Sequence, residues 1–340
     1  MKEFREGSIN CAGPAKYPYI WRPSGYGSNM NFLLLAWATA IVEGHEDFSV
    51  IVNTRRFFAR TMCEHASNGT ETRGGWGCIF SAMPHLCTFD DEEDWSSFNY
   101  RRGLSPTEQR AAAERGTVPS IFRKRNVVAA AISSSGGDLM GAFAGLLDYL
   151  HSHTQPWFRA DVQTILDEPA IAALRGEKYV GMHIRRTDKI LETKSTVTEK
   201  YFQNAAQYLD KSPNGLAATD ISGLWVSTDD RAVVDEVKAL APQYFPEIMP
   251  EAIIFISDRV RVEQPVGPET DEISSGRNIY DAWVLLRVEL EMLAEADVFS
   301  GTFSSNLGRI VVLMRHALGK PSESALSGDT PRWFPGRQRR

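Results

Sequence analysis

Long apolar runs are missing from this sequence. The longest one near the start, Phe32 to Val42, is about half as long as a membrane-spanning helix, which needs roughly 20 apolar residues. No basic segment followed by an apolar one opens the chain, so no secretory signal is predicted. An excess of basic residues is missing too, because the formal net charge is −6. This balance argues against a nucleic-acid-binding protein.

Three glycine-containing motifs of common enzyme classes are also absent. No GxGxxG follows a predicted strand, which disfavours a dinucleotide cofactor. Neither GxxxxGKS nor GxxxxGKT occurs, which disfavours a P-loop kinase or ATPase. The lack of GxSxG removes the usual signature of an α/β-hydrolase. A nucleotide site in this chain therefore has to be built from other residues.

Cysteine is scarce, and Cys11, Cys63, Cys78 and Cys87 all lie in the first quarter of the chain. An even, clustered set favours disulfides, although three pairings are open. Zinc binding is the alternative, but no CxxC spacing supports it. One N-glycosylation sequon is present at Asn68-Gly69-Thr70, and chance sequons are common. These residues alone leave the compartment undecided.

The composition, with 43% hydrophobic and 24% charged residues, is that of a soluble globular protein, and 340 residues favour two domains. From about residue 177, short apolar runs alternate with amphipathic segments. The apolar runs predict strands over 179–184, 223–227, 252–256 and 297–300. The amphipathic segments predict helices over 196–211, 230–241, 280–296 and 305–318. This alternation predicts an α/β fold with a mainly parallel sheet, and we divide the chain into domains 1–175 and 176–340.

Helix boundaries follow from capping signals. A capping box with proline at the first helical position, Ser105-Pro106-Thr107-Glu108, predicts one helix start, and Asp138 is expected to cap a helix that runs to about Ser152. Thr196 to Glu199 also fits a capping box. Pro242 is expected to stop the helix that Asp230 caps.

Polar side chains cluster where the predicted strands end, and ligands of parallel sheets bind beyond those ends. The first cluster is His183-Ile184-Arg185-Arg186-Thr187-Asp188-Lys189. Two adjacent guanidinium groups suit a pyrophosphate because each forms planar, charge-assisted hydrogen bonds. The alternative interpretation is a surface ion-pair cluster.

Two further strand ends carry polar residues. In Ser227-Thr228-Asp229-Asp230, the last aspartate fits a helix N-cap, and the Asp-Asp spacing does not favour a metal site. In Gly301-Thr302-Phe303-Ser304-Ser305-Asn306, small hydroxyl residues precede a helix, whose N-terminus can hold a phosphate. Together the three strand ends predict a clamp for a nucleoside diphosphate, with no metal.

These three motifs resemble those of the α-1,6-fucosyltransferase family, which includes core N-glycan fucosyltransferases and bacterial nodulation enzymes. They occur in the family's order and with similar spacing over residues 177–315, and Gly25-Tyr26-Gly27 resembles its glycine-rich loop more loosely. The resemblance implies a two-domain GT-B-like fold with a C-terminal Rossmann-like domain. It also implies inverting transfer of fucose from GDP-fucose, without a metal, to a hydroxyl (O6) of a GlcNAc-containing glycan.

The resemblance carries roles to individual residues. Arg185 would hold the β-phosphate of the leaving GDP, supported by Arg186, while His183 would face the nucleoside and Glu289 would read guanine. Backbone N–H groups of Gly27 and Ser28 would meet the phosphates. The complete set implied for donor binding is Gly27, Ser28, His183, Arg185, Arg186, Asp188, Asp229, Asp230, Glu289, Ser305 and Asn306.

On the acceptor side, the resemblance makes Glu192 the catalytic base and Lys189 its proton relay. The alignment needs a one-residue deletion, which also brings Tyr201 onto a family tyrosine among the acceptor-binding residues. Without the gap, Thr193 stands at the position of the base, and a threonine cannot serve as this base. The catalytic set is therefore Arg185, Lys189 and Glu192.

The resemblance also pairs Cys11 with Cys87, which implies an oxidising compartment. The location expected is the Golgi or secretory lumen for a eukaryotic protein and the cytoplasm for a bacterial one. Three alternatives stay open: a protein O-fucosyltransferase, another GDP-sugar transferase, and an inactive glycan-binding homologue. The sequence fixes neither the acceptor glycan nor the oligomeric state.

Overall fold

The computed structural model describes residues 17–20, 26–42, 48–53, 79–81, 86–89, 121–134, 136–186, 196–255 and 279–329. The chain forms two compact units. The first comprises Met1–Ser24, Asn29–Gln155 and Pro335–Arg340. The second comprises Gly25–Ser28 and Pro156–Phe334, and it holds the three strand ends singled out above. Within the described residues no helix has the length and apolarity to cross a membrane.

The first unit combines a small parallel sheet with helices. Strands β1 (Tyr17–Ile20), β2 (Phe48–Asn53) and β3 (Leu86–Phe89) pair in the order β1-β2-β3. Its helices are α1 (Tyr26–Val42), α4 (Ile121–Ser134) and α5 (Leu139–Ser152). The predicted cap of α5 is confirmed, because the Asp138 carboxylate accepts the N–H of Gly141 at 2.7 Å.

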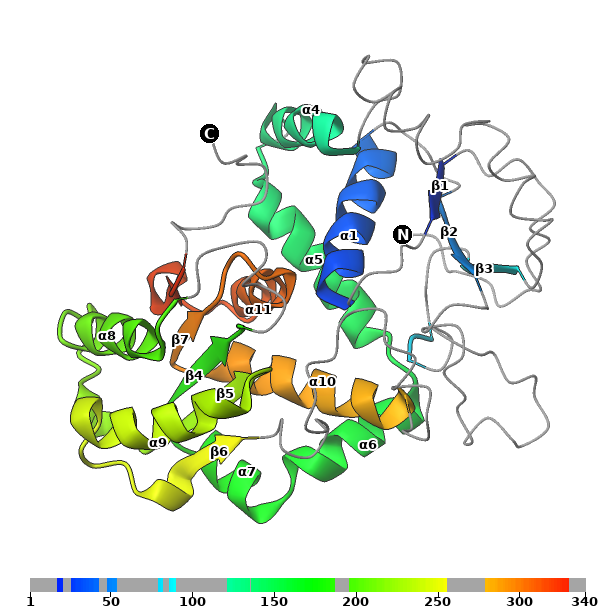
Figure 1. Cartoon of the computed structure of the whole chain (residues 1–340). Coiled ribbons are helices and arrows are strands. Elements are labelled where there is room, and N and C mark those ends of the chain that lie inside the picture. The colour runs from blue at the N-terminus through cyan, green and yellow to red at the C-terminus, as the bar shows by residue number, and fades with distance from the viewer. Residues whose placement is uncertain are drawn as a thin grey trace. The chain divides into compact units, whose positions relative to one another are not determined.

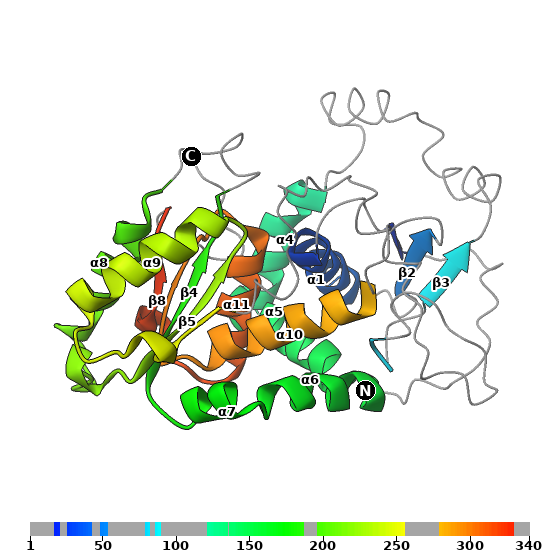
Figure 2. The same cartoon turned by 60° about the horizontal axis from the view of Figure 1, so that its bottom comes forward.

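The second unit is a parallel five-stranded sheet flanked by helices, which confirms the predicted α/β class. The strands are β4 (Tyr179–Ile184), β5 (Gly223–Thr228), β6 (Ile253–Phe255), β7 (Val298–Gly301) and β8 (Ala325–Ser327), in the order β6-β5-β4-β7-β8. The helices are α6 (Pro156–Leu166), α7 (Pro169–Arg175), α8 (Thr198–Leu209), α9 (Arg231–Tyr244), α10 (Ile279–Glu295) and α11 (Asn306–Ala317). Helices α8 and α9 lie on one face of the sheet, and α10 and α11 on the other (Figure 1, Figure 2).

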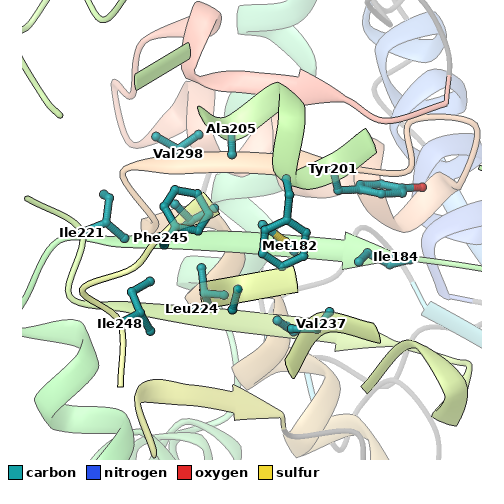
Figure 3. Packing of buried hydrophobic residues seen from close by; sticks show 14 of the residues in the cluster. Met182, Ile184, Tyr201, Ala205, Ile221, Leu224, Val237, Phe245, Ile248 and Val298 are labelled. Atoms are coloured by element: carbon teal, nitrogen blue, oxygen red, sulfur yellow. The ribbon is translucent and has the colours of Figure 1, made fainter. Parts of the chain in front are cut away.

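The central strand β4 is buried along its whole length because both of its faces are covered. Val180, Met182 and Ile184 point to α8 and α9 and join the core cluster drawn in Figure 3. The alternate residues point to α10: the Tyr179 hydroxyl donates to the Met292 carbonyl at 2.7 Å. This alternation decides which helix each site residue at the end of β4 faces.

A buried arginine fixes the end of α10. The Arg315 side chain on α11 is only 2% exposed, and its guanidinium donates to the carbonyls of Ala294, Ala296 and Asp297 and to the Ser324 hydroxyl. Burial lowers the pKa of this guanidinium to about 10. These bonds satisfy carbonyl groups at the C-terminus of α10 and tie that helix to α11 and to the turn before β8.

Two expectations about elements are wrong, and one strand was missed. Helix α8 begins at Thr198 with Val197 as its N-cap, and no side chain caps it, so the capping box at Thr196 to Glu199 does not form. Helix α9 continues through Pro242 to Tyr244. Pro242 is exposed, so water can replace the hydrogen bond that proline cannot make. Strand β8, which spans only three residues, was not expected at all.

Candidate functional site

The order of the strands reverses between β4 and β7, the first and fourth strands of this sheet in sequence. Such a switch point leaves a crevice beyond the carboxyl ends of two neighbouring strands, where α/β proteins bind ligands. Arg185 follows β4, and the turn from Thr302 to Ser305 follows β7. His183 pairs in register with Ser227 of β5 on one side and Gly301 of β7 on the other. The three predicted strand ends therefore meet at one edge of the sheet.

Arg185 is held from two sides at the switch point. Its backbone N–H donates to the Thr302 hydroxyl at 3.1 Å. Its side-chain Nε lies 3.6 Å from a carboxylate oxygen of Asp229, which follows β5. The side chain remains 35% exposed. A guanidinium that is oriented by contacts with Thr302 and Asp229 and is partly exposed to solvent is suited to binding an anionic group.

Arg186 has a different environment. Its backbone N–H donates to Asp229 at 2.8 Å, and its guanidinium forms a bidentate pair with Glu236 of α9, at 2.8 and 2.7 Å. The Asp230 carboxylate lies 3.8 Å away. The hydrogen bond to Glu236 raises the pKa of Arg186, whose side chain is 14% exposed. Its donor-binding role stays a prediction, and these contacts commit the guanidinium to α9.

Thr302 connects the two strand ends. Its backbone N–H and its hydroxyl both donate to the His183 carbonyl, at 2.9 and 3.1 Å. The hydroxyl oxygen also accepts from Arg185 and lies 2.7 Å from the Tyr201 hydroxyl. Because the single hydroxyl proton of Thr302 goes to His183, Tyr201 is the donor in that last bond.

Tyr201 lies in the core rather than on the surface. Its side chain is 1% exposed, and burial raises the pKa of the phenol to about 12. Figure 3 shows its ring beside Ile184, with the hydroxyl directed past the end of β4. A Cβ atom on Gly328 would overlap this ring, so glycine is needed there. The geometry supports a role for Tyr201 in positioning Thr302, and the predicted contact with an acceptor stays untested.

The turn between β7 and α11 is fixed by a carboxylate that sequence reasoning missed. Asp329, two residues beyond β8, accepts the N–H of Phe303 at 2.8 Å and the N–H of Ser304 at 3.3 Å. Ser305 is the N-cap of α11, and its hydroxyl accepts from Leu307 at 3.4 Å. No motif marks Asp329, because its role depends on the pairing of β8 with β7.

Residues on the α10 and α11 face lie next to this turn. His183 is buried, and a Cβ on Gly308 of α11 would lie 3.5 Å from its Nδ1, so the helix packs closely on the ring. Glu289 of α10 is 6% exposed and accepts from the Ser227 hydroxyl at 3.0 Å. Since Ser227 pairs with His183, the carboxylate and the imidazole predicted to face a nucleoside lie on the same side of the sheet.

Other predicted residues lie apart from this cluster or outside the described residues. Gly27 and Ser28 lie in the first turn of α1, not in a loop, and they group with the second unit. Asn306 opens α11, where its side-chain oxygen accepts from Arg309 at 3.0 Å. Of the predicted site residues, Asp188, Lys189, Glu192 and Cys11 lie outside the described part of the chain, as do Cys63, Cys78, the sequon at Asn68 and the capping box that begins at Ser105. Cys87 lies on β3 with no description of its side chain, so the disulfide stays a prediction.

The described part of the second unit has a hollow but no candidate metal cluster. Among the described residues, no group of three His, Cys, Asp or Glu side chains could hold a metal ion. A hollow of about 670 Å³ lies along α8 and β8, lined in part by Asn204, Tyr208, Lys211 and Glu323. None of the predicted site residues lines this hollow.

No family model matches the chain. Solved structures of similar fold do exist. The fold is similar to that of a solved fucosyltransferase. A variant of Arabidopsis thaliana FUT1 in complex with GDP is 11% identical, with a TM-score of 0.51, over 90% of this chain and 70% of that one.

Two further fucosyltransferases match with lower scores. Fucosyltransferase NodZ from Bradyrhizobium is 14% identical over 88% of this chain and 92% of its own, with a TM-score of 0.42. POFUT1 in complex with GDP-fucose is 11% identical over 93% and 98%, with a TM-score of 0.44. At these identities the likeness concerns the fucosyltransferase fold alone.

Proposed function

We propose that this protein transfers fucose from GDP-fucose to a sugar hydroxyl, with inversion and without a metal. The observation that carries the proposal is Arg185, an oriented and partly exposed guanidinium at the switch point of the sheet. The shared fold supports it, since the FUT1 variant was solved with GDP. The acceptor we favour is O6 of a GlcNAc residue, because the motifs resemble those of α-1,6-fucosyltransferases.

The donor chemistry follows from charge. As the bond between fucose and GDP breaks, positive charge grows on the sugar ring and negative charge on the β-phosphate. Arg185 stabilises the departing pyrophosphate. Ser305 and Asn306, at the N-terminus of α11, bind the side of the pyrophosphate that faces away from Arg185. Asp229 holds Arg185 in place, while Asp230 and Arg186 organise the strand end behind it. Asp188 completes the donor set.

The nucleoside occupies the α10 and α11 face. His183 lies against the base or ribose, and the Glu289 carboxylate reads guanine, because one carboxylate can accept from both N1–H and the 2-amino group. Ser227 orients that carboxylate through its hydroxyl. Backbone N–H groups of Gly27 and Ser28 add donors for the phosphates.

On the acceptor side, Glu192 removes the proton from the attacking hydroxyl, and Lys189 relays it. The Glu192 carboxylate meets the acceptor hydroxyl only once the acceptor is bound. Glu192 and Lys189 both belong to the connection between β4 and α8, so this connection determines the geometry of attack. Tyr201 contributes to this region indirectly, through the hydrogen bond between its hydroxyl and that of Thr302.

A transfer assay with several acceptors tests the function. Purified protein is incubated with GDP-fucose and, in parallel, a chito-oligosaccharide, an N-glycan with GlcNAc at its reducing end, a folded peptide domain and buffer alone. We expect fucose on a GlcNAc-containing glycan, with an α-1,6 linkage by NMR. Transfer to the peptide instead would favour a protein O-fucosyltransferase. GDP binding without transfer to any acceptor would favour an inactive glycan-binding homologue.

A further inference from the structure

Glu236 of α9 forms hydrogen bonds with Arg186 and Thr198, both of which are distant from it in the sequence. Its two carboxylate oxygens accept from the two terminal nitrogens of Arg186 at 2.8 and 2.7 Å. The same carboxylate also accepts the hydroxyl proton of Thr198. The hydroxyl of Thr198 in turn accepts from the Arg186 guanidinium. The three side chains therefore form a closed triangle of hydrogen bonds among β4, α8 and α9.

The two partners of Glu236 have special positions in the chain. Arg186 follows β4 by two residues, and Thr198 is the first residue of α8. They therefore mark the two ends of the connection that carries Asp188, Lys189 and Glu192 in the sequence.

We propose that Glu236 is a positioning residue for fucose transfer, which binds both ends of the β4–α8 connection and so sets where the connection places its acid–base residues. This inference rests on the proposed function. It assigns a role to a residue that touches neither donor nor acceptor. The physical basis is that a bidentate guanidinium–carboxylate pair restricts the relative orientation of the two groups more tightly than a single hydrogen bond does.

The environment of Glu236 suits this role at neutral pH. The hydrogen bond from Arg186 lowers the pKa of the Glu236 carboxyl below its usual value of about 4.3, so the group is ionised at neutral pH. Its side chain is 41% exposed, so the pair adds little to global stability. A contact that contributes little to stability but fixes a direction should affect the transfer step more than the fold.

The test compares Glu236→Gln with a matched control. Glu199 also joins α8 to α9 through a carboxylate, since the Tyr244 hydroxyl donates to it at 2.7 Å, and Arg186 is not its partner in that bond. We expect Glu236→Gln to lower kcat on the order of ten- to a hundred-fold, because small misplacements of a catalytic group have effects of that size. The Kd for GDP should stay within about two-fold of wild type. Glu199→Gln should leave both constants near wild type.

A second variant, Thr198→Val, removes one link and keeps the Arg186–Glu236 pair, so we expect an intermediate loss of kcat. Wild-type protein that neither binds GDP nor transfers fucose would overturn the proposed function itself. Active wild type with Glu236→Gln and Thr198→Val at the kcat of the Glu199→Gln control would overturn the positioning role alone. A parallel loss of GDP affinity in Glu236→Gln would also overturn it, because the effect would then extend to the whole site.

Discussion

Replacing Arg185 by alanine is expected to lower kcat/KM for fucose transfer several hundred-fold. In the proposed mechanism the guanidinium faces the β-phosphate as negative charge develops there, and removing one preorganised donor of this kind costs about 3–4 kcal/mol of transition-state stabilisation. The backbone contact of Arg185 with Thr302 uses the main chain, so the substitution leaves it in place. The loss should therefore be one of charge rather than of fold, and steady-state kinetics with GDP-fucose measure it.

Arg175 supplies the matched control. It lies just before the opposite end of β4 and pairs with Glu295 through two bonds of 2.7 and 2.6 Å. Arg175→Ala removes the same charge and an ion pair from the same unit, so it should leave kcat/KM within a few-fold of wild type. Turnover of Arg185→Ala at the level of wild type would remove Arg185 from the leaving-group role.

Replacing Glu192 by glutamine is expected to abolish transfer while GDP binding persists. Glutamine has nearly the same shape but cannot accept a proton at neutral pH, and a general base contributes about a hundred- to ten-thousand-fold to rate. GDP should bind with unchanged Kd, since the residues proposed to hold it lie at the strand ends. Single-turnover transfer and calorimetric GDP titration of the same preparation separate the two effects.

Thr193→Val is the companion variant. It tests the alignment without a gap, in which Thr193 takes the place of the base, and we expect near-normal transfer because that hydroxyl is no base. Normal transfer by Glu192→Gln would exclude Glu192 as the base. It would leave the donor site untouched, because the role of Arg185 does not depend on that assignment.

Elements with strong local signals were predictable from the sequence. Strand β4 is a continuous apolar run that ends in charge, and α5 has a capping aspartate and a clear apolar stripe, so both formed as expected. Strand β8 has three residues, too few for a period to show, and it forms because β7 offers it a free edge. The start of α8 was misjudged for a related reason: the helix begins at Thr198, whose hydroxyl bonds to Glu236, 38 positions away, rather than to its own helix.

The sequence predicted that the three strand ends lie close together, but it did not predict the contacts that each residue makes there. The carboxyl ends of parallel strands must share an edge, so Arg185, Asp229 and Ser305 could be brought together from sequence. Residue type alone does not distinguish Arg185 from Arg186, which follows it directly, and the different roles given to them came from the family resemblance. Only the packing of α9 shows that Arg186 is committed to Glu236 while Arg185 remains partly exposed.

The same limit explains Tyr201 and Asp329. A tyrosine on an amphipathic helix gives no sign of whether its hydroxyl faces solvent or a buried threonine, and here it meets Thr302. Asp329 carries no motif, yet it binds two backbone N–H groups of the turn before α11. Both residues bind partners that are distant in the sequence and lie close to them only in the folded sheet.

Calorimetric titration with GDP, UDP and ADP, on wild type and on Arg185→Ala side by side, tests the central claim most directly. The account predicts that wild type binds GDP and prefers it to UDP and ADP, because Glu289 reads guanine beside the switch point, and that Arg185→Ala binds GDP more weakly. Equal affinity for the three nucleotides, or GDP binding that Arg185→Ala leaves unchanged, would contradict a GDP-sugar site at the carboxyl edge of this sheet.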